Sequence, residues 1–168
     1  TKNKSAAASV QTGQYGLFNG RIALSSSNKK SYVSGGLQQN KAKGMQMRGT
    51  TGYFDNDLAN ISYARKLNDA WRLMLRAAAD SRDFNAQNFY TSFVSDTARE
   101  KVSSTWQQLA LTRTSEKSTF SIMANARQLK DIYAFRPVSI PNQNSTKLFN
   151  ADMRHTVRLK WQQAKFTS

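Results

Sequence analysis

The stretch DAWRLMLRAAAD (residues 69–80) fits two kinds of secondary structure that exclude each other. Its Ala and Leu content, with a polar residue available as N-cap, indicates an amphipathic helix. Every second residue from Trp71 to Ala79 is apolar, however, which is the period of a strand. A helix would also bring Arg72 beside Arg76, a mildly repulsive pair. We therefore expect a strand with one apolar face.

The same alternation recurs along the chain. It is found in FNGRIALSS (18–26), STFSIMANAR (118–127) and MRHTVRLKW (153–161). Read as a helix, the last of these would spread its cations around the whole circumference. About eight such segments can be counted. The sequence therefore predicts an all-β fold, an antiparallel meander of strands.

The connections between these segments are of two kinds. Short polar links are found at SSNKKS (26–31), KLND (66–69) and TSEKS (114–118). Much longer stretches are found at residues 40–57, 81–103 and 129–152. Compact soluble domains rarely carry several structureless loops of that length. Short turns at one end and long loops at the other are typical of bacterial outer-membrane barrels, so we expect the meander to form part of a transmembrane β-barrel.

Composition also suggests a different class of protein. Lys and Arg number 25 against 10 Asp and Glu, a formal net charge of +15. Such a chain attracts polyanions, which makes a soluble nucleic-acid-binding protein the main alternative. Base-stacking candidates for that alternative are Phe89, Tyr90, Tyr133 and Phe135. Against it, the cations recur singly on alternating faces and no known nucleic-acid motif is present, so we expect no nucleic-acid partner.

Residues that carry catalysis are scarce. The chain has one His and no Cys, and no Ser–His–Asp, metal-binding or phosphate-loop pattern is recognisable. The single His155 falls on the apolar face of its segment, where a structural or rim position is expected. We therefore predict that the chain is not an enzyme and uses no cofactor.

Aromatic residues gather near the short links. Four lie within a few residues of one, and a fifth stands where the next turn should begin. These residues are Tyr32, Tyr63, Trp71, Phe120 and Trp161. Aromatic rings settle at the headgroup level of a membrane, so we expect an interface girdle at this end.

The order and spacing of these segments resemble the early barrel strands of TonB-dependent outer-membrane receptors. TKNKSAAASVQTGQYG (1–16) is similar to the exit from the plug domain, with the first barrel strand and a turn. ISYARKLNDAWRLMLRAAADSRDF (61–84) and STWQQLALTRTSEKSTFSIMANARQLKDIYAF (104–135) are similar to two hairpins of that family. The resemblance implies a barrel of 22 strands with the plug inside. Residues 1–168 would then be the N-terminal part of that barrel, without the plug or the remaining strands.

The resemblance implies a transport function in the outer membrane of a Gram-negative bacterium. A scarce ligand, such as a ferric siderophore, another metal chelate or cobalamin, would bind outside. TonB would then pull on the plug, and the ligand would pass through the lumen. The expected partners are outer-membrane lipid, the protein's own plug and remaining strands, TonB and the ligand. A barrel outside this family, such as a porin or an adhesin, remains a third possibility.

Two groups of residues are the candidate binding positions. The basic side chains expected to face the lumen are Arg21, Arg72, Arg76, Arg127, Arg154, Arg158 and Lys160. They would either attract an anionic ligand or pair with acidic groups of the plug. Asp55 and Asp57, in YFDND (53–57), are placed in a long outer loop and are weak candidates for binding calcium.

Overall fold

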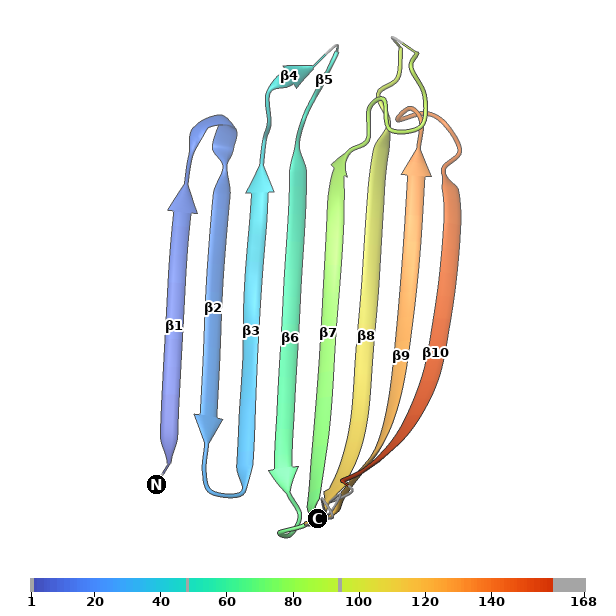
Figure 1. Cartoon of the computed structure of the whole chain (residues 1–168). Coiled ribbons are helices and arrows are strands. Elements are labelled where there is room, and N and C mark those ends of the chain that lie inside the picture. The colour runs from blue at the N-terminus through green and yellow to red at the C-terminus, as the bar shows by residue number, and fades with distance from the viewer. Residues whose placement is uncertain (1, 48, 94, 159–168) are drawn as a thin grey trace, which may run out of the picture.

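The computed structural model describes residues 2–47, 49–93 and 95–158. They form one antiparallel sheet of eight strands, each paired with its neighbours in the sequence (Figure 1). In spatial order the strands are β1 (Asn3–Thr12), β2 (Phe18–Ser27), β3 (Ser31–Ala42), β6 (Phe54–Lys66), β7 (Trp71–Asn85), β8 (Arg99–Thr114), β9 (Ser118–Ala134) and β10 (Asn142–Val157). The predicted all-β meander is confirmed.

Three minor elements lie in the links. A 3-10 turn, η1 (Gln14–Gly16), joins β1 to β2, and its Tyr15 and Gly16 both adopt positive φ. The small hairpin of β4 (Gln46–Met47) and β5 (Thr50–Thr51) lies between β3 and β6. No helix within the described residues is both long and apolar enough to cross a membrane.

The links differ at the two ends of the sheet. Residues 28–30, 67–70 and 115–117 make the turns at one end, which we call the short-turn end. Residues 13–17, 43–53, 86–98 and 135–141 make the links at the opposite end, which we call the long-loop end. The two kinds of connection therefore segregate as the sequence predicted, and both ends can be followed in Figure 1.

The long links are shorter than predicted, because the strands continue into them. The link expected at residues 129–152 is mostly strand: β9 runs to Ala134 and β10 begins at Asn142. Near the long-loop end both faces of the strands carry polar residues, so the alternation fades although the hydrogen-bond ladder continues. The point at which the apolar alternation stops is therefore not the point at which the strand ends.

The three short turns close in the same way. Asn68 Oδ1 accepts hydrogen bonds from the backbone N–H groups of Ala70 and Trp71, at 3.0 and 2.9 Å. Asn28 closes the β2–β3 turn in the same manner, and Ser115 Oγ accepts the N–H of Ser118 at 3.1 Å. A short polar side chain at the first turn positions therefore replaces a missing backbone partner and fixes the register of the hairpin.

The sheet is a single layer without a second layer to form a core. The chain exposes 13091 Å², whereas a compact monomer of its mass would expose about 8,300 Å². The buried apolar residues in the described part are Ala86, Ala98, Val102 and Ala110. Most of the stabilisation of this sheet therefore has to come from its ladder and from whatever covers its faces.

We predict that Asn68→Ala weakens the β6–β7 hairpin. Loss of two hydrogen bonds should lower the free energy of unfolding by about 1 kcal/mol. The measurement is urea unfolding of the chain in detergent micelles. Asp69→Ala, in the same turn, is the control and should change stability by less; equal losses would mean that the Asn68 side chain does not hold this turn.

Candidate functional site

The register gives the sheet two chemically different faces. Directly paired residues share a face, and successive residues along a strand alternate between faces. Trp71, Leu73 and Leu75 therefore share a face with their partners Arg113, Leu111 and Leu109. The other face carries the residues between them, beginning with Arg72. Every strand can be assigned in this way, because the pairing is continuous from β1 to β10.

One face carries a stripe of apolar side chains that crosses all eight strands and is interrupted on β8 by Gln107; we call it the apolar band. It consists of Ala6, Ala8, Val10, Gly20, Ile22, Leu24, Val33, Gly35, Leu37, Ala59, Ile61, Tyr63, Leu73, Leu75, Ala77, Ala79, Leu109, Leu111, Ile122, Ala124, Ala126, Phe149, Ala151 and Met153. Many are widely exposed, with Leu37 at 62% and Phe149 at 76%. A water-soluble monomer rarely exposes an apolar surface of this extent.

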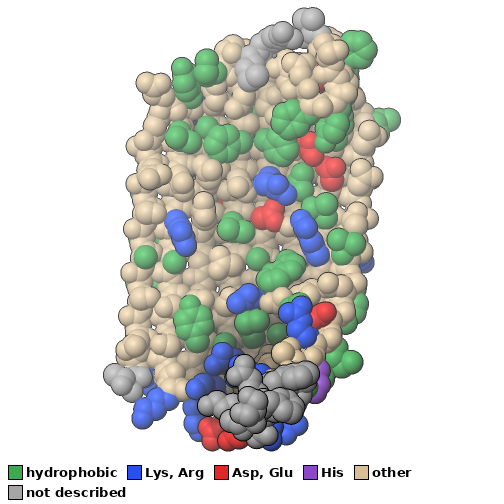
Figure 2. Space-filling model, in the orientation of Figure 1, with side chains coloured by type: hydrophobic (Ala, Val, Ile, Leu, Met, Phe, Trp, Pro, Cys, Tyr) green, Lys and Arg blue, Asp and Glu red, His purple; other side chains and the backbone are tan. Residues whose placement is uncertain are grey.

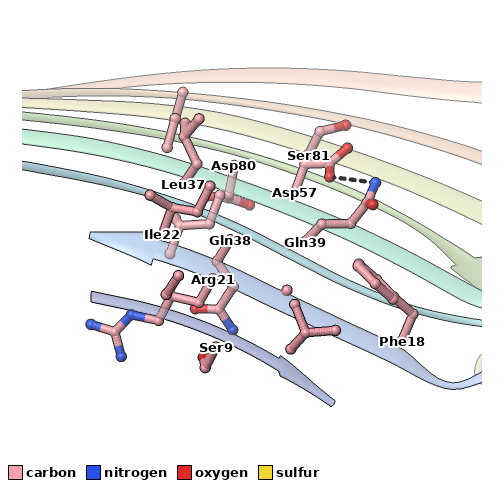
Figure 3. Close-up of a pocket in the computed structure, with 16 residues that line it drawn as sticks. Ser9, Phe18, Arg21, Ile22, Leu37, Gln38, Gln39, Asp57, Asp80 and Ser81 are labelled. Carbon is pink, nitrogen blue, oxygen red and sulfur yellow. Dashed lines mark hydrogen bonds between the residues drawn. The ribbon is translucent and has the colours of Figure 1, made fainter. Parts of the chain in front are cut away.

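The alternation can be followed at β2 and β3 in Figure 3. Ile22 and Leu37 lie on one side of the strands, whereas Arg21 and Gln38 point to the other. A shallow groove runs over the apolar side, with Phe18 at its long-loop end. Beside it Gln39 donates a hydrogen bond to Asp57 at 3.1 Å, which marks the polar boundary of the apolar band.

The opposite face, which we call the polar face, carries charges in the middle of the strands. Figure 2 views this face and shows basic and acidic side chains scattered among hydrophobic and other side chains. Ser104 donates a hydrogen bond to Asp80, and Arg82 Nε lies 3.2 Å from the same carboxylate. Gln108 Nε2 donates to Asn125 Oδ1 at 2.9 Å. The face is therefore a hydrogen-bonded polar surface rather than a second apolar one.

Five of the predicted lumen-facing cations share the polar face. They are Arg21, Arg72, Arg76, Arg127 and Arg154. No carboxylate among the described residues forms an ion pair with them: the pairs found there are Arg82–Asp80 and Arg99–Asp83. Arg158 follows the end of β10 and is exposed, and Lys160 lies outside the described residues. Whether the polar face lines a lumen stays a prediction.

The predicted aromatic girdle is only partly on one face. Tyr63, Trp71 and Phe120 lie on the side of the apolar band; Trp71 stacks with Arg113 at 5.9 Å, and Phe120 meets His155 edge-on at 6.2 Å. His155 is exposed near the short-turn end, and that this is the rim of a barrel stays a prediction. Trp161 lies outside the described residues.

Tyr32 departs from that expectation. It is paired with Ser27 and Ala64 and lies on the polar face. The prediction rested on distance from a turn alone, and one residue of register decides the face.

The placement of the calcium candidates was wrong. Asp55 and Asp57 lie within β6 rather than in a loop, opposite Lys41 and Gln39 of β3. Their spacing of two puts both on one face because the segment is extended. No group of three or more His, Cys, Asp or Glu side chains suited to a metal ion is found among the described residues.

Sequence reasoning missed the folded link between β7 and β8. Asp96 is fully buried, and its carboxylate accepts hydrogen bonds from the N–H groups of Asn88 and Ala98, both at 2.8 Å, and from Thr91 Oγ1 at 3.2 Å. The Gln87 side chain donates to the Asp96 carbonyl at 2.8 Å. Short polar residues spread over this link were the available signal, but only the fold shows which of them is the acceptor.

Aromatic side chains stand at the same end of the sheet. Tyr90 meets Tyr133 edge-on at 4.8 Å and donates a hydrogen bond to Glu100, while Phe89 and Phe93 are about two-thirds exposed. Nearby, Tyr53 donates to Asp83 at 3.0 Å, and burial together with this carboxylate raises the pKa of Tyr53 to about 12. The long-loop end thus carries exposed aromatic rings next to tyrosines that are held by hydrogen bonds to carboxylates.

Comparison with known proteins adds no family assignment. The chain matches no model of a known protein family, and no curated protein is significantly similar to it.

We predict that Asp96→Ala opens the β7–β8 link. Loss of three hydrogen bonds to a buried acceptor should make residues 86–98 the first site of cleavage by a protease, while the strands stay resistant. Mass spectrometry of the fragments measures this. Thr91→Val, which removes one of the three bonds, should have a smaller effect; cleavage that begins elsewhere in both variants would contradict the role of Asp96.

Proposed function

We propose that this chain is a sector of a transmembrane β-barrel of the TonB-dependent receptor class, in the outer membrane of a Gram-negative bacterium. The observation that carries the proposal is the apolar band. It crosses every strand, stands opposite a charged polar face, and has charged residues beyond both of its borders. Lipid tails on one side and a polar interior on the other account for both faces together.

The height of the apolar band suits a bilayer. On β7 it runs from Leu73 to Ala79, and with the adjoining Trp71 nine residues pass without a charged residue on that face. A tilted strand needs about 9–11 residues to cross the hydrocarbon layer. The strands are 10 to 17 residues long, so each extends beyond the apolar band into polar surroundings.

The free edges support a larger closed sheet. β1 and β10 each pair on one side only, and the described sheet does not close on itself. Within lipid every backbone N–H and C=O needs a partner, which an antiparallel sheet achieves only by closing. The remaining strands of the same barrel would supply the partners for both edges.

The unpaired arginines suit the transport role that the family resemblance implies. Five guanidinium groups on the polar face have no carboxylate partner within the described sheet. In a receptor they would meet acidic groups of the plug or an anionic ligand such as a ferric chelate, which TonB action on the plug would release inward. The nucleic-acid alternative accounts for the charge but leaves the exposed apolar band unexplained.

The proposal is tested by adding a charge to the apolar band in one variant and removing a charge from the polar face in another. In the whole protein, Leu75→Arg should cost roughly 2 to 4 kcal/mol of folding free energy when the barrel forms in lipid vesicles, because Leu75 would face the bilayer. Arg76→Gln, one residue away on the polar face, should fold almost as the parent does. The measurement is the yield of heat-resistant, strand-rich protein in the vesicles.

Three results would contradict parts of this proposal. Equal tolerance of both substitutions would mean that the apolar band does not face lipid. A chain that is monodisperse and cooperatively folded in plain buffer would favour the soluble nucleic-acid-binding class. In the whole protein, uptake of a metal chelate that does not require TonB would favour a porin.

A further inference from the structure

The two ends of the sheet differ sharply in charge. At the short-turn end the basic residues are Lys2, Lys4, Lys29, Lys30, Arg65, Lys66, Arg72, Arg113, Lys117, Arg154 and Arg158, and the acidic ones are Asp69, Glu116 and Asp152. At the long-loop end the described acidic residues are Asp55, Asp57, Asp80, Asp83, Asp96, Glu100 and Asp131, beside a similar number of cations. Both ion pairs of the described residues lie there. The excess positive charge of the described chain therefore lies mainly at one end.

Five of these cations surround one cleft. The cleft lies between the β2–β3 turn and the adjoining ends of β6 and β7, and it measures about 290 Å³. It opens mainly on the polar face, whereas its Arg65 lies on the side of the apolar band. Its basic lining residues are Lys29, Lys30, Arg65, Lys66 and Arg72, and none of its lining residues is acidic. The backbone N–H of Lys66 donates to the carbonyl of Lys30 at 2.8 Å, which holds the two turns side by side. Like charges are thus kept together without a counter-charge in the cleft.

The second observation is that basic side chains of the short-turn end lie just beyond the edge of the apolar band. On β6 Arg65 follows Tyr63, and on β8 Arg113 follows Leu111, each on the same face as the band. Trp71, paired with Arg113, stands at the same level. A row of aromatic and then basic side chains directly below an apolar surface matches the order of layers in a bilayer, where phosphates lie just beyond the hydrocarbon.

We infer that the short-turn end is a binding site for the phosphate groups of anionic phospholipids, formed by Arg65 and Arg113 on the side of the apolar band together with Lys29 and Lys30 of the adjoining turn. The inference rests on the proposed function, because a bilayer around the apolar band is what brings headgroups to this level. The charge asymmetry selects the occupant: a zwitterionic surface offers these cations no net attraction, whereas each cation beside an anionic surface gains about fivefold in affinity. The long-loop end, with its matched charges, has no such preference.

The test compares two triple variants of the whole protein, with the remaining strands present. Lys29→Gln, Lys30→Gln and Arg65→Gln are combined in one, and Lys41→Gln, Lys101→Gln and Lys147→Gln in the other. The second set removes the same charge at the long-loop end, on the face of the apolar band. Each protein is diluted from urea into vesicles of phosphatidylcholine alone or mixed with phosphatidylglycerol. Flotation gives the partition coefficient, and circular dichroism confirms strand formation.

The first variant should lose roughly a hundredfold in partitioning to the phosphatidylglycerol vesicles at low salt, since three cations are removed. The second should lose much less, and neither should change with phosphatidylcholine alone. Equal losses in both variants would overturn the site, because net charge alone would then explain binding. Inorganic phosphate that displaces the chain at the lipid's own phosphate concentration would overturn the lipid assignment. Insertion into phosphatidylcholine alone tests the proposed function separately, so the two can fail independently.

Discussion

The constraint on which this structure depends is that each strand can satisfy its backbone only through its two neighbours. With no second layer, the ladder from β1 to β10 is the framework, and it forces side chains to alternate between two surfaces. The register then decides which of the two surfaces each side chain belongs to. Leu75 and Arg76 are adjacent in the chain, yet one belongs to the apolar band and the other to the polar face. A shift of one residue in a single hairpin would exchange them.

That dependence explains how much of the fold could be read from the sequence. Between Trp71 and Ala79 the two-residue period is clean, so the strand, its faces and the turn before it were predictable. From Ser81 to Asn85 the two-residue period is lost while pairing with β8 continues, so the end of the strand could not be predicted. Asp55 and Asp57 fell in such a region and were assigned to a loop. Tyr32 shows a second limit of prediction from sequence. Nearness to a turn indicates where along the strand a residue lies, but only the register shows which face of the sheet it occupies.

The candidate sites follow the same division. Five of the predicted arginines share a face because each stands on a regularly alternating strand. The buried Asp96 and the cleft between two turns depend instead on contacts across chain segments that no local pattern encodes. Asn28 and Asn68 lie at equivalent positions of neighbouring hairpins, and their repeated role in closing turns is recognisable only after the pairing is known. The asymmetry of charge between the ends is likewise a property of the folded sheet.

The neighbour-only pairing also has a consequence for how the chain reaches this form. The longest link between paired strands runs from residue 86 to residue 98, so the entropy cost of loop closure is small at every step. Low contact order of this kind favours rapid, local association. The strands lengthen from 10 residues in β1 to 16 and 17 in β10 and β9. Later hairpins therefore form more hydrogen bonds than earlier ones, which suits growth of the sheet by stepwise templating from one finished strand to the next.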